Sequence, residues 1–275
     1  MVVPVWDDYV SDRLGEALAS VRAQDRQAPI VVVDNASSTR LPPLPGTLVV
    51  RAPARLTLGE ARNLGLSRVT TPYVVFWDAD DLMLPGTLAF LETQIAAQPK
   101  LAAYGMAIVE EPTGRRHRWP RRWIARLARA PQIFALLHSI WSLYPSTGAT
   151  IMRSDLARAA HGYGDADSGE DWCLGVSLAF RGHIGWSEQP GRLYRVHSSS
   201  TWAQHMTPGD LRRHARAVRE RIRSDAGIPE WVRTSLPLIG LGQGVAIRAH
   251  VLVQTARTLR HQAAIRGRAG VATRR

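Results

Sequence analysis

Residues 73–81 read YVVFWDADD, an apolar run followed by acidic residues. Its first five residues are strongly apolar, which predicts a short buried strand. Three carboxylates, Asp78, Asp80 and Asp81, follow where that strand ends. In open α/β sheets ligands bind outside the carboxyl ends of the strands, so we expect the functional site at this edge.

Strand and helix signals alternate around this stretch, over the first 110 residues. The β-branched run at residues 30–33 has no polar alternation, which is typical of a strand buried on both faces in a parallel sheet. The alternation predicts an open, mostly parallel α/β sheet flanked by helices. Further strands are expected at residues 2–5, 48–50 and 101–109, and helices at residues 14–21, 59–68 and 84–95, with Pro85 in the first turn of the last.

The second half of the chain has less regular signals. A strand is expected at residues 147–152, a helix at 170–180, two short strands at 183–186 and 192–196, and basic helices at 211–223 and 245–266. We therefore expect one domain over residues 1–206 and a basic helical C-terminal extension over residues 207–275.

The chain is strongly basic. Its 275 residues include 35 lysines and arginines against 23 acidic residues, a formal net charge of +12, and Lys100 is the only lysine. This charge suggests nucleic acid, an anionic membrane or a phosphate-bearing substrate as partner. The sequence carries no helix-turn-helix, zinc-finger or RNA-binding signature, and its carboxylates would repel phosphates without a metal, so we expect no nucleic-acid partner. The single cysteine, Cys173, excludes an internal disulfide and favours a reducing compartment.

Membrane-spanning and targeting signals are weak. Residues 130–145 are short and contain His138, and residues 236–253 are interrupted by Pro237, glycines and Arg248, so neither is expected to span a membrane. The chain opens without a secretory signal, and we expect a cytoplasmic protein. The basic helix at 211–223 either packs on the rest of the protein or docks peripherally on the inner face of an anionic membrane.

Two kinds of candidate residue follow the predicted strands. Asp78 and Asp80, separated by one residue, can both reach a hard cation such as Mn²⁺ or Mg²⁺; the alternative is a solvated turn before a helix. Asp34 follows the second strand, where it can hydrogen-bond a ribose or base; the alternative is an Asx-turn. Trp6 ends the first strand and adds an aromatic ring to the same edge.

Three further candidates lie outside the strand ends. Arg62 falls in the first turn of a helix that begins near Gly59, where it can face a diphosphate. Glu170 and Asp171 open a helix, so they either complement its dipole or supply a base with a raised pKa. His197 ends a strand and is either structural or a ligand.

Taken in order, these segments resemble the inverting family 2 glycosyltransferases of the GT-A fold. The resemblance covers roughly residues 1–200 and comprises residues 2–6 (VVPVW), 32–37 (VVDNAS), 59–65 (GEARNLG), 76–81 (FWDADD), 169–171 (GED) and 194–197 (YRVH). It implies a GT-A catalytic domain over residues 1–206 with a Rossmann-like nucleotide-binding half. Trp6 replaces the more common tyrosine of the family, and residues 115–129 match no part of its pattern.

The resemblance also implies a role for each candidate residue. Pro4 and Trp6 would bind the nucleotide-sugar donor, with Trp6 stacked on the base, and Asp34 would accept the base imide N–H, which favours uracil or thymine. Arg62 would lie near the diphosphate. Metal contacts would come from Asp78, which also approaches the ribose, from Asp80 and from His197. Asp171 would be the catalytic base and Glu170 its support.

The implied reaction is metal-assisted, inverting transfer of a hexose-type sugar from a UDP- or dTDP-sugar to a hydroxyl group. We expect the acceptor to be a saccharide or a lipid-linked molecule, as in the synthesis of cell-envelope polysaccharide. A nucleotidyltransferase of related sheet architecture is the alternative, but it would normally carry a Gly-rich basic loop where this chain reads PVWDD at residues 4–8.

Overall fold

A computed structural model of the chain describes residues 1–111, 114, 116–117, 122–144, 146–195 and 207–272. Its first strands, β1 (Val2–Val5), β2 (Ile30–Asp34) and β3 (Thr47–Arg51), form a parallel sheet in the order β1-β2-β3. A parallel bridge between Val2 and Phe76 joins β1 to the segment that follows β4 (Tyr73–Val75). The backbone N–H of Trp77 donates to the Val2 carbonyl oxygen over 2.9 Å, so the sheet continues across this junction.

The rest of the sheet is mixed. Its strands run in the order β4-β8-β6-β9-β5, and β7 pairs with β6 off this path. Among the described strands of this part, β6 and β9 pair in parallel, and the other pairs are antiparallel. The strands are β5 (Leu82–Met83), β6 (Leu101–Glu111), β7 (Arg116–His117), β8 (Thr150–Arg153) and β9 (His183–Arg195).

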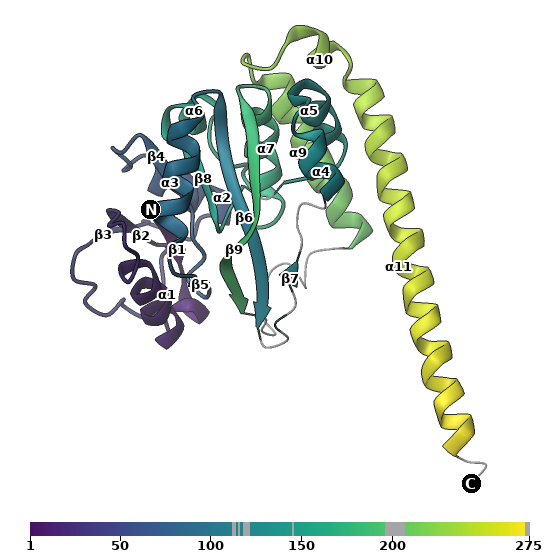
Figure 1. Ribbon diagram of the computed structural model, residues 1–275, viewed down its shortest axis with the longest axis horizontal. Coiled ribbons are helices and arrows are strands. Elements are labelled where there is room, and N and C mark those ends of the chain that lie inside the picture. The colour runs from purple at the N-terminus through teal and green to yellow at the C-terminus, as the bar shows by residue number, and fades with distance from the viewer. Residues whose placement is uncertain (112–113, 115, 118–121, 145, 196–206, 273–275) are drawn as a thin grey trace.

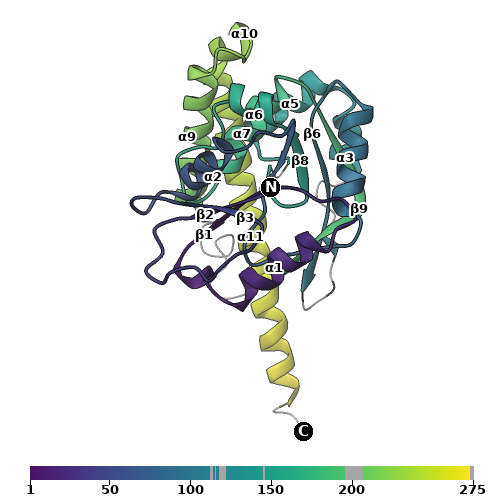
Figure 2. The same cartoon turned by 90° about the vertical axis from the view of Figure 1, so that its left-hand side faces the viewer.

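Helices cover both faces of the sheet (Figures 1 and 2). On one face α1 and α3 pack against Val3, Val5 and Val32. On the other, α2 packs on β1 and β2, and apolar residues of α5, α6 and α7 belong to the same buried cluster as Val2, Val31 and Val33. These elements are η1 (Asp7–Tyr9), α1 (Asp12–Arg22), α2 (Leu58–Leu66), α3 (Thr87–Ala97), α4 (Arg122–Leu127), α5 (Pro131–Ile140), α6 (Ser154–Ala159) and α7 (Glu170–Ala179). Neighbouring valines point to opposite faces and both faces are buried, which confirms the predicted parallel α/β core.

Two local predictions are wrong. Pro85 does not lie in the first turn of α3, because Gly86, with φ of 75°, ends a turn before the helix begins at Thr87. The two strands expected at 183–186 and 192–196 are one strand, β9, up to Arg195. The pairing of β9 with β6 shifts its register near Met106 and Ala107, which forms a β-bulge. The residues between the two predicted strands, expected as a turn, therefore lie inside β9.

The C-terminal region contains α9 (Pro208–Ser224), α10 (Glu230–Thr234) and α11 (Leu236–Ala272). The apolar stripe of α9 is buried in one cluster with Trp172, Cys173 and Val176 of α7, and consists of Leu211, Ala215, Val218 and Ile222. The basic helix therefore packs on the rest of the protein. The predicted boundary between residues 206 and 207 falls at the end of a segment outside the described residues and remains a prediction.

Helix α11 is longer and less interrupted than expected. Pro237 is its second residue. Backbone N–H groups in the first turn of a helix make no hydrogen bond within the helix, so a proline there does not break it. By length and composition alone, Leu236–Ala256 is apolar enough to cross a membrane, and 22% of its most apolar window is buried against the protein. In Figure 1, α11 runs along the side of the body, and its C-terminal half extends beyond it.

A buried ion pair attaches the end of α9 to the segment after α7, and it makes stability depend on pH. Burial opposes ionisation of Asp225, but hydrogen bonds from Arg181 of 2.7 Å and 2.5 Å hold its pKa below the ordinary value. A depressed carboxyl pKa contributes stability above the unfolded value of about 4 and loses it as pH falls through the folded value.

Breaking this pair should therefore destabilise the protein. Asp225→Asn leaves Arg181 without its charge partner, and we expect a loss of about 3 kcal/mol in the free energy of unfolding at pH 7, measured by urea denaturation. The loss should shrink when both proteins are compared below about pH 4. Asp155→Asn breaks the exposed pair with Arg153 and is the control, with an expected change below about 1 kcal/mol. Equal effects of the two variants would contradict this assignment.

Candidate active site

The sheet brings the predicted strand-end residues to one edge. Val5 of β1 pairs with Asp34 of β2, and Val2 bridges to Phe76, so Trp6, Asp34 and Asp78 follow neighbouring strands at their carboxyl ends. Pro4 lies one residue short of this edge, buried within β1 opposite Val33.

Asp34 is almost fully buried, and its carboxylate is already hydrogen-bonded. One oxygen accepts the Ser37 backbone N–H over 3.0 Å, as in the Asx-turn alternative, and the other accepts from Arg51 over 2.5 Å. Arg51 is the residue paired with Asp34 in the register of β2 and β3. A carboxylate has about four acceptor sites, so these two bonds leave capacity for a ligand.

An arginine stacks on the ring of Trp6. The Arg55 guanidinium lies 4.5 Å from the centre of the Trp6 ring, and Tyr9 meets the same ring edge-on at 4.7 Å. The loop that carries Arg55 is held by Asn35, whose side chain accepts from the Leu56 N–H over 2.8 Å and donates to the Leu56 carbonyl over 2.9 Å. The Trp6 ring thus lies next to the positive charge of Arg55, an arrangement suited to a flat and anionic ligand.

Two buried arginines lie at the centre of the site. Arg62 of α2 donates to one Asp78 oxygen over 2.7 Å and also pairs with Glu170. Arg192 of β9 donates to the other Asp78 oxygen over 2.6 Å and also pairs with Asp81. Asp78 therefore lies between two guanidinium groups that belong to different parts of the fold.

The other two acids of the DADD segment face β9. Asp81 accepts the backbone N–H of Arg195 over 2.9 Å, and the Asp80 carbonyl accepts from the Arg195 side chain. Burial raises the pKa of Asp81 to about 7, against the attraction of Arg192 and with the repulsion of Asp80 and Asp78. Asp81 thus holds β9 in place, and Asp80 stands next to it, nearly buried.

Glu170 and Asp171 begin α7 and have different environments. Glu170 is buried against Arg62, and burial raises its pKa to about 7 although the guanidinium opposes this shift. Asp171 is half-buried, and burial raises its pKa against the attraction of Arg62 and hydrogen bonds from the backbone of Ser146 and Trp172. Asp171 is therefore the acid of the pair that solvent or an acceptor can reach.

Helix α2 is fixed against the loop that precedes α7. Thr57 and Glu60 form a capping box, and Asn63 exchanges two hydrogen bonds, of 2.8 Å and 3.1 Å, with the backbone of Tyr163. Arg62 lies over the Tyr163 ring at 5.1 Å, and the Tyr163 hydroxyl donates to the Ser146 carbonyl over 2.6 Å. The position of Arg62 is thus set by packing as well as by charge.

The site has an excess of negative charge. It gathers five carboxyl groups, from Asp78, Asp80, Asp81, Glu170 and Asp171, against three guanidinium groups, from Arg62, Arg192 and Arg195. The raised pKa of Asp81 and of Glu170 leaves these two groups partly protonated near pH 7, so the excess is small. A diphosphate would be repelled by this excess, so a bound cation would help to hold it. Among the residues that the structure describes, no group of three or more His, Cys, Asp or Glu side chains is placed to hold a metal ion. Asp78 and Asp80 supply the hard oxygen atoms that suit a cation shared with phosphates, not one enclosed by protein.

One predicted site residue cannot be placed in the site, and several residues that contact the site were not predicted. His197 falls outside the described residues, as do parts of the unmatched segment 115–129. Sequence reasoning missed Arg51, Arg55, Tyr163 and, above all, Arg192. Arg192 could have been found from its place inside a predicted strand. A charge that is buried needs an acidic partner, so an arginine at that place indicates a carboxylate nearby.

An α/β sheet with an acidic carboxyl edge is typical of enzymes that bind nucleotides or their sugars, and the comparisons define the family. Residues 1–158 match the family described as "Glycosyl transferase family 2", and the chain belongs to it. This confirms the resemblance seen in the sequence. No curated protein matches the chain by sequence.

Solved structures confirm the fold. The chain is similar to a structure described as S. aureus TarS 1-349 in complex with UDP-GlcNAc, with a TM-score of 0.66, 16% identity and coverage of 89% of this chain and 72% of the other. A second, the same fragment in complex with UDP, has a TM-score of 0.62 and 17% identity, with 87% and 69% coverage. At this level of identity the similarity shows the fold alone.

The contact between α2 and the loop before α7 can be tested at a glycine. A side chain at Gly59 would overlap the carbonyl oxygen of Gly164, so Gly59→Ala must push α2 away from that loop. We expect a loss of about 2 kcal/mol in the free energy of unfolding, measured by urea denaturation.

The matched control is Gly15→Ala in α1, where nothing lies within 4 Å of the added carbon. This change should stabilise the protein by up to about 1 kcal/mol, because alanine favours a helix over glycine. A neutral or stabilising Gly59→Ala would show that α2 and the loop are not in close contact.

Proposed function

We propose that this protein transfers a sugar from a UDP- or dTDP-sugar to a hydroxyl group, with inversion at the anomeric carbon and with Asp171 as general base. The observation that carries the proposal is the half-buried Asp171 beside the buried pair of Arg62 and Glu170, which also contacts the half-buried Asp78. Family membership supports a glycosyltransferase over the alternative nucleotidyltransferase. A donor with a uracil base is also supported by the similar TarS structures, described with UDP-GlcNAc and with UDP.

The donor would lie along the carboxyl ends of β1, β2 and β4. Its base would stack on Trp6, with Pro4 shaping the end of β1, and its imide N–H would donate to Asp34 beside the existing bonds from Ser37 and Arg51. Arg62 would face the diphosphate from α2. The single cysteine, Cys173, is a buried free thiol, in keeping with a cytoplasmic enzyme.

A divalent cation fits the donor atoms at this edge. Asp80 and Asp78 would hold Mn²⁺ or Mg²⁺ together with phosphate oxygens, and His197 would add a further contact. Such a cation, when bound, neutralises charge on the leaving diphosphate. Arg62 is already fixed beside Asp78 and would stabilise the same charge without reorganisation.

The chemical step needs one base. The acceptor O–H proton passes to the Asp171 carboxylate while the acceptor oxygen bonds to the anomeric carbon, and the bond from that carbon to the phosphate oxygen breaks with its electron pair on the diphosphate. Burial raises the pKa of Asp171, which makes its carboxylate a stronger base. Glu170 is paired with Arg62 and therefore acts as a positioning residue. The acceptor would be a saccharide or a lipid-linked hydroxyl compound, as in cell-envelope polysaccharide synthesis.

Donor and metal binding can be measured by thermal shift. UDP or dTDP should raise the melting temperature clearly with Mn²⁺ or Mg²⁺ and weakly without it, since ligand at about 100 times its Kd adds roughly 2.7 kcal/mol. GDP should raise the melting temperature less, because its two-ring purine is larger than the pyrimidine expected between Trp6 and Asp34. Asp80→Ala should abolish the increment that the metal adds, whereas Asp155→Ala, away from this edge on α6, should keep it. Nucleotide binding that is indifferent to metal in every variant would contradict the metal assignment.

Variants of Asp171 and of Glu170 should differ in their kinetic constants and in their stability. Asp171→Asn should lower kcat by about 10²- to 10⁴-fold with little change in the donor KM, because loss of a general base affects the transition state alone. Glu170→Gln should reduce kcat less and lower the melting temperature more, because it removes the charge partner of buried Arg62.

The pH profile adds an independent readout. Asp171 must be ionised to act as a base, so activity should fall as pH falls through its pKa, at a higher pH than for an ordinary aspartate. Asp171→Asn should remove this acidic limb from any residual activity. A folded but inactive Glu170→Gln together with an active Asp171→Asn would assign the base to Glu170.

A further inference from the structure

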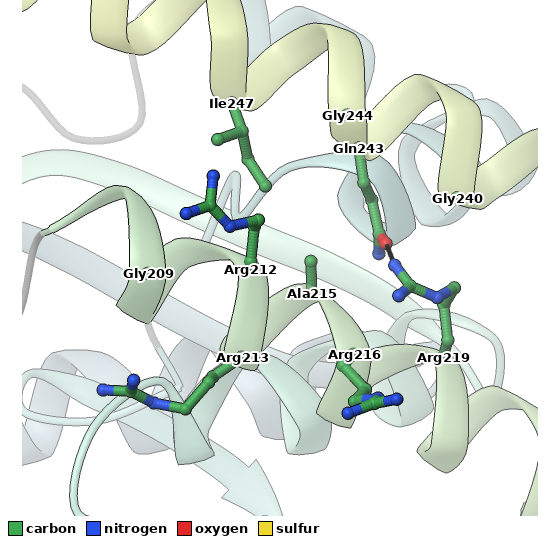
Figure 3. Close-up of a pocket in the computed structure, with 10 residues that line it drawn as sticks. All are labelled: Gly209, Arg212, Arg213, Ala215, Arg216, Arg219, Gly240, Gln243, Gly244 and Ile247. Atoms are coloured by element: carbon green, nitrogen blue, oxygen red, sulfur yellow. Dashed lines mark hydrogen bonds between the residues drawn. The ribbon is translucent and has the colours of Figure 1, made fainter.

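The helices α9 and α11 line a groove of about 520 Å³ whose α9 wall is cationic (Figure 3). Its α9 side is lined by Arg212, Arg213, Arg216 and Arg219, and its α11 side by Gly240, Gln243, Gly244 and Ile247. The groove lies in the C-terminal region, and none of its lining residues belongs to the candidate active site.

Few acids neutralise these arginines. Arg213 pairs with Asp210, and Arg219 donates to the Gln243 side-chain oxygen, which is neutral. Within the described part of the chain, Arg212 and Arg216 form no ion pair, and both are exposed. A guanidinium group without a carboxylate partner matches the geometry and charge of a phosphate group.

An apolar row lies beside the groove on α11. Leu238, Leu241, Val245 and Leu252 recur at helical spacing and are 70%, 67%, 58% and 70% exposed. At 100° per residue, the row is centred about 140° around the helix from the groove-lining residues of α11, so it faces outward from the protein. The protein itself leaves this row uncovered, and an exposed apolar row beside cations is typical of an interaction surface.

The inner side of α11 is held to the protein by polar and aromatic contacts. The Gln243 side chain donates to the Ser139 carbonyl over 2.8 Å, and His250 lies 5.2 Å from the Trp141 ring. A membrane crossing would break these contacts or carry the arginines of α9 into hydrocarbon, at a high cost in free energy. Helix α11 is therefore suited to lie along a membrane surface, not to cross it.

We propose that the arginine groove and the apolar row of α11 form a docking surface for an anionic phospholipid bilayer. Headgroup phosphates bind Arg212, Arg216 and their neighbours in the groove, and Leu241 and Leu252 enter the boundary of the acyl chains. The stripe of α9 has no part in this, because it is buried in the core. The proposal is independent of the sugar-transfer reaction, and its test needs no donor or acceptor.

The test is vesicle flotation of the full chain. The protein should bind vesicles of phosphatidylcholine mixed with phosphatidylglycerol, bind pure phosphatidylcholine poorly, and dissociate at high salt. The double variant Arg212→Gln with Arg216→Gln should lower partitioning at least about tenfold, since each arginine near an anionic surface contributes about fivefold. Leu241→Asn with Leu252→Asn should lower it by a similar factor. These side chains are exposed, so both variants should keep the wild-type melting temperature.

Matched controls separate the surface from overall charge and hydrophobicity. Arg26→Gln with Arg68→Gln removes the same charge at exposed positions after α1 and after α2, and Leu48→Asn removes an exposed leucine from β3. Both controls should bind like the wild type. Equal binding of neutral and anionic vesicles, or wild-type binding by both test variants, overturns the proposal. So does a wild-type dimer that ignores vesicles and that Leu241→Asn with Leu252→Asn converts to a monomer, because the row then contacts a second copy of the chain.

Discussion

The site depends on the position of Asp78 between the guanidinium groups of Arg62 and Arg192. These arginines come from α2 and β9, and each also holds another acid, Glu170 at the start of α7 or Asp81 after β4. One carboxylate thus joins both halves of the sheet and the helix that carries the proposed base. Charges buried in this way stabilise a protein only while every partner is present, so the group specifies one arrangement of these elements more than it adds stability.

The parallel half of the fold could be predicted from local sequence. The run of β-branched residues at β2 and the apolar stretch that ends at Asp78 both indicate strands buried on two faces, and the structure contains them. Their ends place Trp6, Asp34 and Asp78 at one edge, because parallel strands end together. This reasoning needs only neighbouring residues and the rules of open α/β sheets.

The rest of the site could not be predicted, because its partners are distant in sequence. Arg192 lies 114 residues from Asp78 and meets it through the pairing of β9 with β5, in which Arg192 lies opposite Met83. Arg51 reaches Asp34 through the register of β2 and β3, which composition does not reveal. Proline and glycine residues were also misleading as signals of turns. Those between residues 183 and 195 lie inside the bulged strand β9, and those between residues 236 and 253 lie within the first turns of α11.

The contacts between α2 and the loop before α7 have a consequence for motion. Asn63 is bonded to the backbone of Tyr163, whose hydroxyl bonds to Ser146, and the Ser146 backbone in turn bonds to Asp171. Arg62 and Asp171 are therefore held by the same connected set of elements. We expect a displacement of α2 to carry both groups in the same direction, because these bonds connect α2 to the backbone that Asp171 contacts.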